Sequence, residues 1–250
     1  MYTLKKSLGQ HFLRDDSYCR KITEALQALP FQRLLEVGPG GGALTKYLLD
    51  LPGVDFRAVE LDDEKIGFLE KTYPSIGGKL IHQSVLDMDA PFAAPFTVVG
   101  NFPYNISTQI LFKILDWGDQ VQSVTGMFQK EVAERVAAAP GSKTYGVISV
   151  LIQAGYRVEY LFDVPPGAFQ PPPKVMSGVI RLLPTASPPM KSRAAFNLLV
   201  KTAFNQRRKT LRNATRGLFS PEVLAESLFD QRAERLSVAD FAALTFKMNP

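Results

Sequence analysis

The chain has 250 residues, of which 46% are hydrophobic and 21% are charged, and its formal net charge is +5. This composition is ordinary for a globular protein with a sizeable core, and no apolar run approaches the roughly 18 residues that span a bilayer. Cys19 is the single cysteine, which excludes an internal disulfide. Residues 1–6 lack the apolar segment of a signal peptide, so we expect a cytoplasmic protein without a membrane partner.

Hydrophobic periodicity over the first three quarters of the chain alternates between the strand and the helix type. Strands are predicted at 33–37, 56–59, 79–82, 96–99 and 121–129, and a closing pair at 156–164 and 175–183. Helices are predicted at 16–29, 43–51, 62–71, 107–115, 130–135 and 147–154. Strands that alternate with helices predict an α/β fold with a Rossmann-like, mostly parallel sheet wrapped on both faces.

The last quarter of the chain differs in composition and pattern. The proline-rich segment 183–189 is predicted to be a linker, and apolar residues beyond it recur at helical spacing. We therefore predict two domains, residues 1–186 with the parallel sheet and residues 187–250 as a small all-α domain.

A block of positive charge opens the second predicted domain. From Lys191 to Arg216 the chain carries eight basic residues and no acidic one. A solvated helix face is the alternative, but such a face repels itself, so a polyanion such as nucleic acid is the favoured partner. The candidate RNA-binding residues are Arg207, Arg208, Lys209, Arg212 and Arg216.

A glycine-rich turn follows the first predicted strand of the sheet. Gly38, Gly40 and Ala43 fit the pattern G-x-G-x-x-G/A, which lets the backbone approach a nucleotide ligand closely. Glu60 comes 22 residues after Gly38 at the end of the next strand, where a carboxylate can accept from both ribose hydroxyls. Taken alone, this pattern predicts NAD as the cofactor.

Two further features favour S-adenosyl-L-methionine over NAD. Glu36 lies two residues before Gly38, where its charge can meet the cationic amino-acid portion of that cofactor. The motif Asn-x-Pro-Tyr at 101–104 follows the strand at 96–99, where an amine acceptor would face the methyl group. A dinucleotide enzyme has no evident use for this motif.

The residues of this motif suit an aromatic amine. The amide oxygen of Asn101 and the carbonyl of Phe102 can accept its hydrogens, which favours the tetrahedral nitrogen that attack requires. Pro103 fixes φ near −65°, and the ring of Tyr104 can stack on a base. An ordinary proline turn after a strand is the alternative interpretation.

Five segments in order resemble one family, the 16S ribosomal RNA adenine dimethyltransferases. They are Lys6–Leu13, Glu36–Gly40, Asn101–Asn105, Val164–Val175 and Ala203–Asn213. The resemblance implies a class I methyltransferase that dimethylates the N6 amine of two adjacent adenosines in the 3′-terminal hairpin of 16S rRNA. It implies action on the immature 30S ribosomal subunit, and we expect a monomer that needs no metal.

The resemblance also implies roles for single residues. Cofactor positions map onto His11, Leu13, Gly38, Glu60, Ser84 and Asn101. Relatives usually carry Asp where this chain has Ser84, which leaves the contact to the adenine of the cofactor in question, and Phe102 replaces the commoner Leu. Phe169 is the candidate that stacks on the target base opposite Tyr104.

Three other functions remain open from the sequence. They are a nicotinamide-dependent oxidoreductase, a 23S rRNA methyltransferase of the erythromycin-resistance type, and a nonenzymatic factor for ribosome assembly or nucleic-acid binding.

Overall fold

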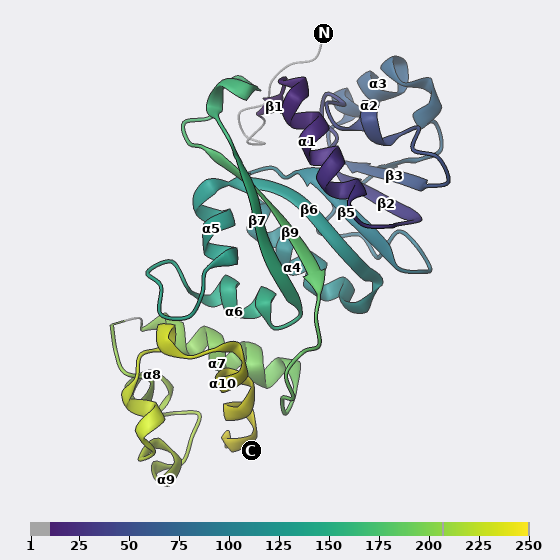
Figure 1. Ribbon diagram of the computed structural model, residues 1–250. Helices are drawn as coiled ribbons and strands as arrows, with labels where there is room; N and C mark the ends of the chain where they lie inside the picture. The colour runs from purple at the N-terminus through teal and green to yellow at the C-terminus, as the bar shows by residue number, and fades with distance from the viewer. Residues whose placement is uncertain (1–10, 207, 250) are drawn as a thin grey trace. The chain divides into compact units, whose positions relative to one another are not determined.

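The computed structural model describes residues 11–206 and 208–249 (Figure 1). Its strands are β1 (Phe12–Leu13), β2 (Arg33–Val37), β3 (Asp55–Glu60), β4 (Leu80–His82), β5 (Phe96–Asn101), β6 (Val121–Gln129), β7 (Tyr156–Val164), β8 (Phe169–Gln170) and β9 (Ser177–Pro184). Its α-helices are α1 (Asp16–Gln27), α2 (Thr45–Leu48), α3 (Asp63–Thr72), α4 (Ser107–Trp117), α5 (Lys130–Ala137), α6 (Val147–Gln153), α7 (Arg193–Asn205), α8 (Leu211–Thr215), α9 (Pro221–Leu224) and α10 (Val238–Leu244).

The main sheet has seven strands in the order β4-β3-β2-β5-β6-β9-β7. Strands β4, β3, β2, β5 and β6 run parallel, and β9 runs antiparallel to β6. The apolar sequence of β5 suits its central place, since all its residues but Asn101 are buried. The predicted α/β class with a mostly parallel sheet is therefore confirmed.

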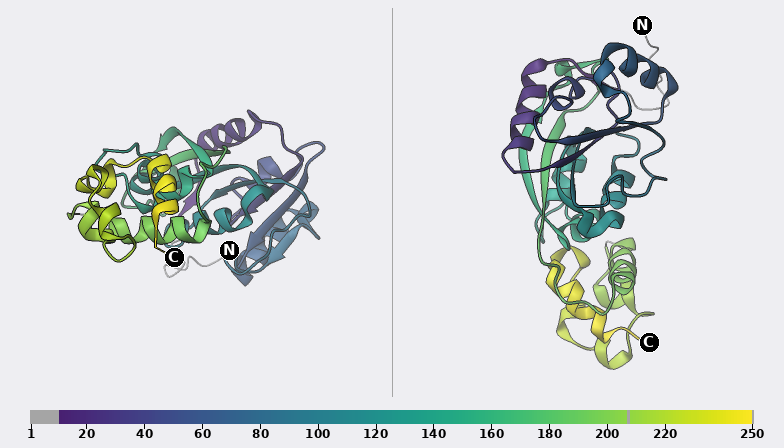
Figure 2. Two further views of the ribbon diagram at one scale, coloured as in Figure 1. Left: turned by 90° about the horizontal axis from the view of Figure 1, so that it is seen from below. Right: turned by 90° about the vertical axis from the view of Figure 1, so that its right-hand side faces the viewer.

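Helices cover both faces of this sheet. Helices α1 and α4 both contact β6 and lie on opposite faces of the sheet (Figures 1 and 2). The buried face of α1 presents Cys19, Ile22 and Leu26, which pack into the core with Leu34 of β2. The helix begins at an N-cap, where the Asp15 carboxylate accepts from the backbone N–H of Ser17 at 2.9 Å.

The parallel strands bring three of the predicted site residues to one edge. Glu36 is paired with Val99 of β5, and Val37 with Val59 of β3, so β2, β3 and β5 end side by side. Glu60 and Asn101 are the last residues of β3 and β5. Ligands of open α/β sheets bind beyond the carboxyl ends of the strands, which makes this edge the expected site.

A separate two-stranded pair closes the same edge. Strand β1 pairs antiparallel with β8, with Phe12 opposite Gln170 and Leu13 opposite Phe169. The backbone N–H of Arg14 also donates to the carbonyl of Ala168 at 2.8 Å. The chain before α1 is thereby held against a loop from far along the sequence.

By its internal contacts the chain forms two compact units. The first comprises Met1–Ala133 and Val158–Pro184, and the second comprises Glu134–Arg157 and Thr185–Pro250. Residues 134–157 join the second unit because α6 packs on α7 and the carbonyl of Gly155 accepts from the N–H of Thr185 at 3.0 Å. The two domains predicted from the sequence, residues 1–186 and 187–250, stay a prediction. Within the described ranges, every helix is too short or too polar to cross a membrane.

Candidate active site

A cavity of about 240 Å³ lies at the carboxyl edge of the parallel strands. It is lined by His11, Phe12, Leu13, Glu36, Gly38, Pro39, Gly40, Ala43, Leu44, Glu60, Leu61, Ser84, Leu86, Asn101, Phe102, Pro103, Tyr104, Asn105 and Ile106. The structure therefore brings together the predicted glycine-rich turn, the two predicted acids and the Asn-x-Pro-Tyr motif. All the predicted cofactor residues line it.

The glycine-rich turn uses backbone conformations that favour glycine. Gly38 and Gly40 have φ angles of +69° and +55°. A Cβ built on Gly40 would lie 2.8 Å from the ring of Phe12, which is too close for a real contact. The turn thus exposes its backbone to the cavity, and no side chain fits at Gly40.

Glu60 holds this turn through its carboxylate. Its Oε2 accepts from the N–H of Gly40 at 3.1 Å, and its Oε1 accepts from the N–H groups of Leu61 and Asp62 at 2.9 and 3.1 Å. A carboxylate has about four acceptor positions, so one position on Oε2 remains for a ligand. The geometry thus leaves Glu60 one free position where two ribose contacts were expected, and the contact itself stays a prediction.

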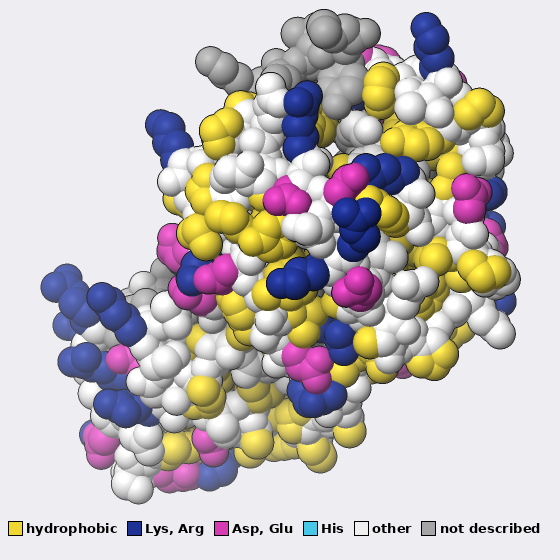
Figure 3. Space-filling view, turned by 45° about the horizontal axis from the view of Figure 1, so that its top comes forward, with side chains coloured by type: hydrophobic (Ala, Val, Ile, Leu, Met, Phe, Trp, Pro, Cys, Tyr) yellow, Lys and Arg dark blue, Asp and Glu magenta, His cyan; other side chains and the backbone are white. Residues whose placement is uncertain are grey.

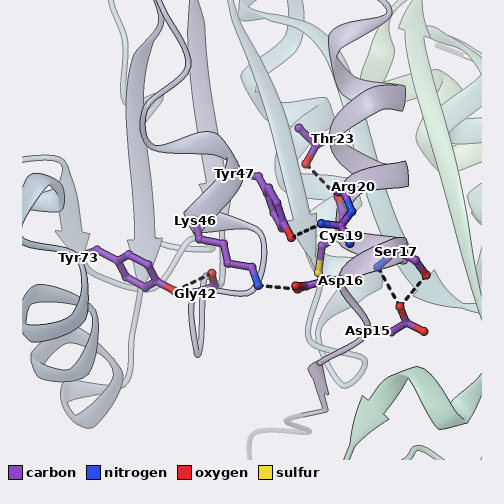
Figure 4. A network of polar contacts seen from close by, with 10 residues as sticks. All are labelled: Asp15, Asp16, Ser17, Cys19, Arg20, Thr23, Gly42, Lys46, Tyr47 and Tyr73. Atoms are coloured by element: carbon purple, nitrogen blue, oxygen red, sulfur yellow. Dashed lines mark hydrogen bonds and ion pairs between the residues drawn. The ribbon is translucent and has the colours of Figure 1, made fainter.

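Other contacts support the chain around this turn (Figure 4). The hydroxyl of Tyr73 donates to the carbonyl of Gly42 at 3.3 Å, and the absence of a side chain at Gly42 lets the tyrosine ring lie against it. Lys46 of α2 pairs with Asp16 of α1 at 2.5 Å. The start of α2 is therefore tied both to α1 and to the end of α3.

Glu36 is a buried acid next to this turn. Only 2% of the residue is exposed, and the hydroxyl of Thr45 donates to its Oε2 at 2.8 Å. Burial, with a smaller contribution from the nearby Glu60, raises the pKa of Glu36 to about 8 from an ordinary value of 4.5, although the hydrogen bond from Thr45 lowers it. This carboxyl is therefore harder to ionise than that of an ordinary glutamate.

The raised pKa of Glu36 predicts a dependence of stability on pH. Between pH 4.5 and about 8 the unfolded chain has lost this proton while the folded chain keeps it, so the free energy of unfolding falls as pH rises. We expect Glu36→Gln to abolish this fall in the free energy of unfolding, because glutamine does not titrate. Melting temperatures of the ligand-free proteins should coincide near pH 4.5 and should be higher for the variant near pH 8.5. The same difference in melting temperature between variant and parent at both pH values would contradict a titration at Glu36.

The Asn-x-Pro-Tyr motif is fixed by contacts from distant parts of the chain. The Nδ2 of Asn101 donates to the backbone carbonyl of His11 at 3.0 Å, which leaves its Oδ1 as an acceptor. Phe102 is fully buried, and its N–H donates to the carbonyl of Met127 at 3.2 Å. Its ring lies in the space left by two glycines, Gly100 and Gly126, where any Cβ would collide with it. The backbone carrying both predicted acceptors is therefore held in place.

Pro103 and Tyr104 complete this wall of the cavity. Pro103 lies within ordinary contact distance, 3.6 Å, of a Cβ built on Gly38, so the motif and the glycine-rich turn adjoin. The ring of Tyr104 stacks with that of His11 at a centroid distance of 5.5 Å. The hydroxyl of Tyr104 lies 2.5 Å from Oγ of Ser177.

Three other predicted residues occupy different surroundings. Leu13 is buried at the wall of the cavity, and the hydroxyl of Ser84 accepts from the N–H of Leu86 at 3.2 Å, which leaves Ser84 one lone pair for a ligand. Phe169 is only 4% exposed and belongs to the hydrophobic core, and it does not line the cavity. Stacking by Phe169 on a base stays a prediction that would require this side chain to leave the core.

Sequence reasoning missed several apolar residues of the cavity. Leu61 follows Glu60 directly, is 56% exposed and lines the cavity. Leu86 also lines the cavity and lies in an irregular segment after β4. An apolar residue directly after the acid at the strand end is the sequence signal that could have identified Leu61, because apolar walls with few polar groups are typical of ligand sites.

The predicted RNA-binding residues lie in the second unit, where Lys and Arg side chains gather near α8 (Figure 3). Arg208, Lys209 and Arg216 are exposed, and Arg207 lies outside the described residues. Arg212 differs, because its Nε donates to the carbonyl of Leu224 at 2.8 Å and its Nη1 lies 2.9 Å from Oδ1 of Asp230. These contacts hold Arg212 inside the unit, so its predicted role in RNA binding competes with a structural one.

Comparison with known proteins gives a consistent result. A family model described as Ribosomal RNA adenine dimethylase matches residues 1–247. The protein named Ribosomal RNA small subunit methyltransferase A from Parabacteroides distasonis is 47% identical, over 96% of this chain and 92% of the relative. The protein of the same name from Cytophaga hutchinsonii is 48% identical, over 96% of this chain and 95% of the relative.

Solved structures with low identity share the fold. A dimethyladenosine transferase from Plasmodium falciparum superposes with a TM-score of 0.78 at 24% identity, over 92% of this chain and 94% of the other. The 23S rRNA methyltransferase ErmE gives a TM-score of 0.67 at 23% identity, over 93% and 99%. At these identities the likeness concerns the architecture alone.

Proposed function

The chain belongs to the ribosomal RNA adenine dimethylase family, and from that membership we propose that it methylates the RNA of the small ribosomal subunit. The proposed reaction places two methyl groups on N6 of each of two adjacent adenosines in the 3′-terminal hairpin of 16S rRNA, within the immature 30S subunit. The proposal is supported most by one observation: the Asn101–Tyr104 motif and the glycine-rich turn line the same cavity. The name shared by the relatives supports small-subunit RNA over 23S rRNA.

The residues around the cavity fit S-adenosyl-L-methionine. The backbone of the turn at Gly38 and Gly40 lines the cavity, Glu60 keeps one acceptor position for a ribose hydroxyl, and Glu36 offers a buried carboxyl for an ammonium group. When bound, this cofactor supplies a methyl group activated by a sulfonium. Leu61 and Leu86 provide apolar surface for a base.

The chain's own residues would make the target amine reactive. The lone pair of an aromatic exocyclic amine is delocalised into the ring, so the amine is a poor nucleophile. In the first transfer Oδ1 of Asn101 and the carbonyl of Phe102 accept its two hydrogens and favour a tetrahedral nitrogen with its lone pair free. In the second transfer the monomethylated nitrogen has one hydrogen left, and one of the two oxygens accepts it. The proton leaves to water after transfer, so the residues contribute chiefly by positioning. Extruding the adenine costs a few kcal/mol, and stacking on Tyr104 returns about 1–3 kcal/mol.

The proposal is tested by methyl transfer to defined RNA substrates. Purified chain is incubated with tritiated S-adenosyl-L-methionine and with unmethylated 30S particles, naked 16S rRNA or 23S rRNA, and the product nucleosides are identified by mass. We expect N6,N6-dimethyladenosine in 30S particles. Label in 23S rRNA alone would favour the erythromycin-resistance type, and binding of 30S particles without label would favour a nonenzymatic assembly factor.

The exposed basic residues of the second unit are proposed to bind RNA phosphates. We expect Arg216→Glu and Arg208→Glu to weaken binding of 16S rRNA and to reduce the salt slope of binding by about one unit per lost contact, without changing cofactor affinity. Lys71→Glu on α3 of the first unit is the matched control, since it makes the same charge change on an exposed residue. Equal weakening by Lys71→Glu would show a nonspecific effect of net charge.

Arg212 is expected to behave differently from the exposed basic residues. Its contacts with Leu224 and Asp230 mean that its loss should lower the melting temperature as well as RNA affinity.

A further inference from the structure

Tyr104 is held by a residue that no sequence motif singled out. Its hydroxyl lies 2.5 Å from Oγ of Ser177, the first residue of β9, and Ser177 is completely buried. Ser177 is itself fixed by the sheet, because it is paired with Gln129 of β6. The contact spans 73 positions of the sequence.

The ring of Tyr104 is also held through one of its faces. The imidazole of His11 stacks on Tyr104 with an interplanar angle of 30°. His11 is in turn anchored, since its Nδ1 lies 3.0 Å from the carbonyl of Pro171 and its own carbonyl accepts from Asn101. His11 therefore stacks on the tyrosine ring, and Tyr104 also lines the cavity.

We propose that Ser177 is a positioning residue for methyl transfer, which holds the ring of Tyr104 where it can stack on the target adenine. This inference rests on the proposed function. A phenol ring turns about two side-chain torsions. The hydrogen bond at its tip restricts χ1, whereas χ2, whose axis passes through the hydroxyl oxygen, is restricted by the stacking on His11. Without the bond to Ser177, the ring would swing about χ1, and the adenine stacked on it would move relative to Asn101. Burial also raises the pKa of Tyr104, so its hydroxyl stays protonated and able to bond at working pH.

The test removes the bond from each end separately and from both ends together. We expect Ser177→Ala and Tyr104→Phe each to lower kcat for methylation of 30S particles about threefold to tenfold, with the KM for S-adenosyl-L-methionine unchanged. The double variant should be no slower than the slower single variant, because both changes remove one interaction. Tyr104→Phe keeps the test valid if the alanine variant folds poorly.

Ser123→Ala is the matched control. Ser123 is also a buried serine of the sheet, and its hydroxyl lies 2.9 Å from that of Thr97. The variant therefore removes a comparable hydrogen bond between two hydroxyl groups. Thr97 lies near the start of β5, four residues before Asn101, which is about 13 Å along a strand. We expect a similar fall in melting temperature and an unchanged kcat.

A spectroscopic readout separates positioning from stability. RNA with 2-aminopurine at the target position is bound to each protein, and its fluorescence is quenched when the base stacks on an aromatic ring. Brighter emission is expected with Ser177→Ala, and emission like that of the unchanged protein with Ser123→Ala.

Two results would overturn the inference while the proposed function stands: an active parent protein whose Ser177→Ala variant has the same kcat and quenching, or single effects that multiply in the double variant. A parent protein that transfers no methyl group to any RNA would instead refute the proposed function itself.

Discussion

Asn101→Ala is expected to lower the turnover of methyl transfer by roughly a hundredfold or more, the scale seen when one preorganised polar group of a reacting centre is removed. The amide is preorganised here, because its Nδ2 donates to the carbonyl of His11 and only Oδ1 is left for the amine. Alanine removes that acceptor and leaves the carbonyl of His11 without this donor. Single-turnover methylation of 30S particles with saturating cofactor measures the effect.

Cofactor binding provides the control for this variant. Isothermal titration with S-adenosylhomocysteine should give an affinity within a few-fold of the parent, because the glycine-rich turn and Glu60 are untouched. Retained turnover would reject Asn101 as the acceptor. Loss of both turnover and cofactor affinity would instead mean that Asn101 serves mainly to hold His11.

Gly40→Ala is expected to reduce cofactor affinity by at least about tenfold, equivalent to roughly 1.4 kcal/mol. Two effects combine at this position. The φ of +55° costs an L-residue roughly 1–2 kcal/mol, and the new methyl group would lie 2.8 Å from the ring of Phe12. Displacing Phe12 disturbs β1 and the cavity wall, and it moves the N–H that donates to Glu60.

Gly53→Ala separates the two effects. Gly53 has a φ of +71°, so the backbone cost is similar, but a Cβ there meets nothing within 4 Å. We expect both variants to lose some stability and only Gly40→Ala to lose cofactor affinity, measured by titration with S-adenosylhomocysteine. Equal affinities for the two variants would show that the turn at Gly40 is not the cofactor cradle.

Local patterns in the sequence were enough to predict the elements that carry the site. The apolar run at 96–99 predicted a strand and the glycine pattern predicted a turn, and both are observed; the central place of that strand and the positive φ angles of the turn come from the structure. Parallel strands end at one edge of a sheet, so predicting the strands also predicted that Glu60 and Asn101 would adjoin the turn. Family membership, predicted from five short motifs, is confirmed by the match over residues 1–247.

Contacts between distant segments could not be predicted in this way. The bond between Asn101 and His11 spans 90 positions, and that between Tyr104 and Ser177 spans 73. Such contacts depend on the register of β1 on β8 and of β9 on β6, which no local pattern encodes. The burial of Phe169 has the same origin, since its pairing with Leu13 turns an apparent loop aromatic into a core residue.

The pairing of β1 with β8 has a consequence for how the protein is made. Leu13 and Arg14 are synthesised long before the residues that they contact. The partner of Leu13 is Phe169, and the N–H of Arg14 donates to the carbonyl of Ala168. A nascent chain can therefore assemble β2 to β6 while the wall formed by Phe12 and Leu13 is still unsupported. We therefore expect ligand binding to be acquired late in synthesis, and prematurely terminated products that lack β8 to bind ligand poorly.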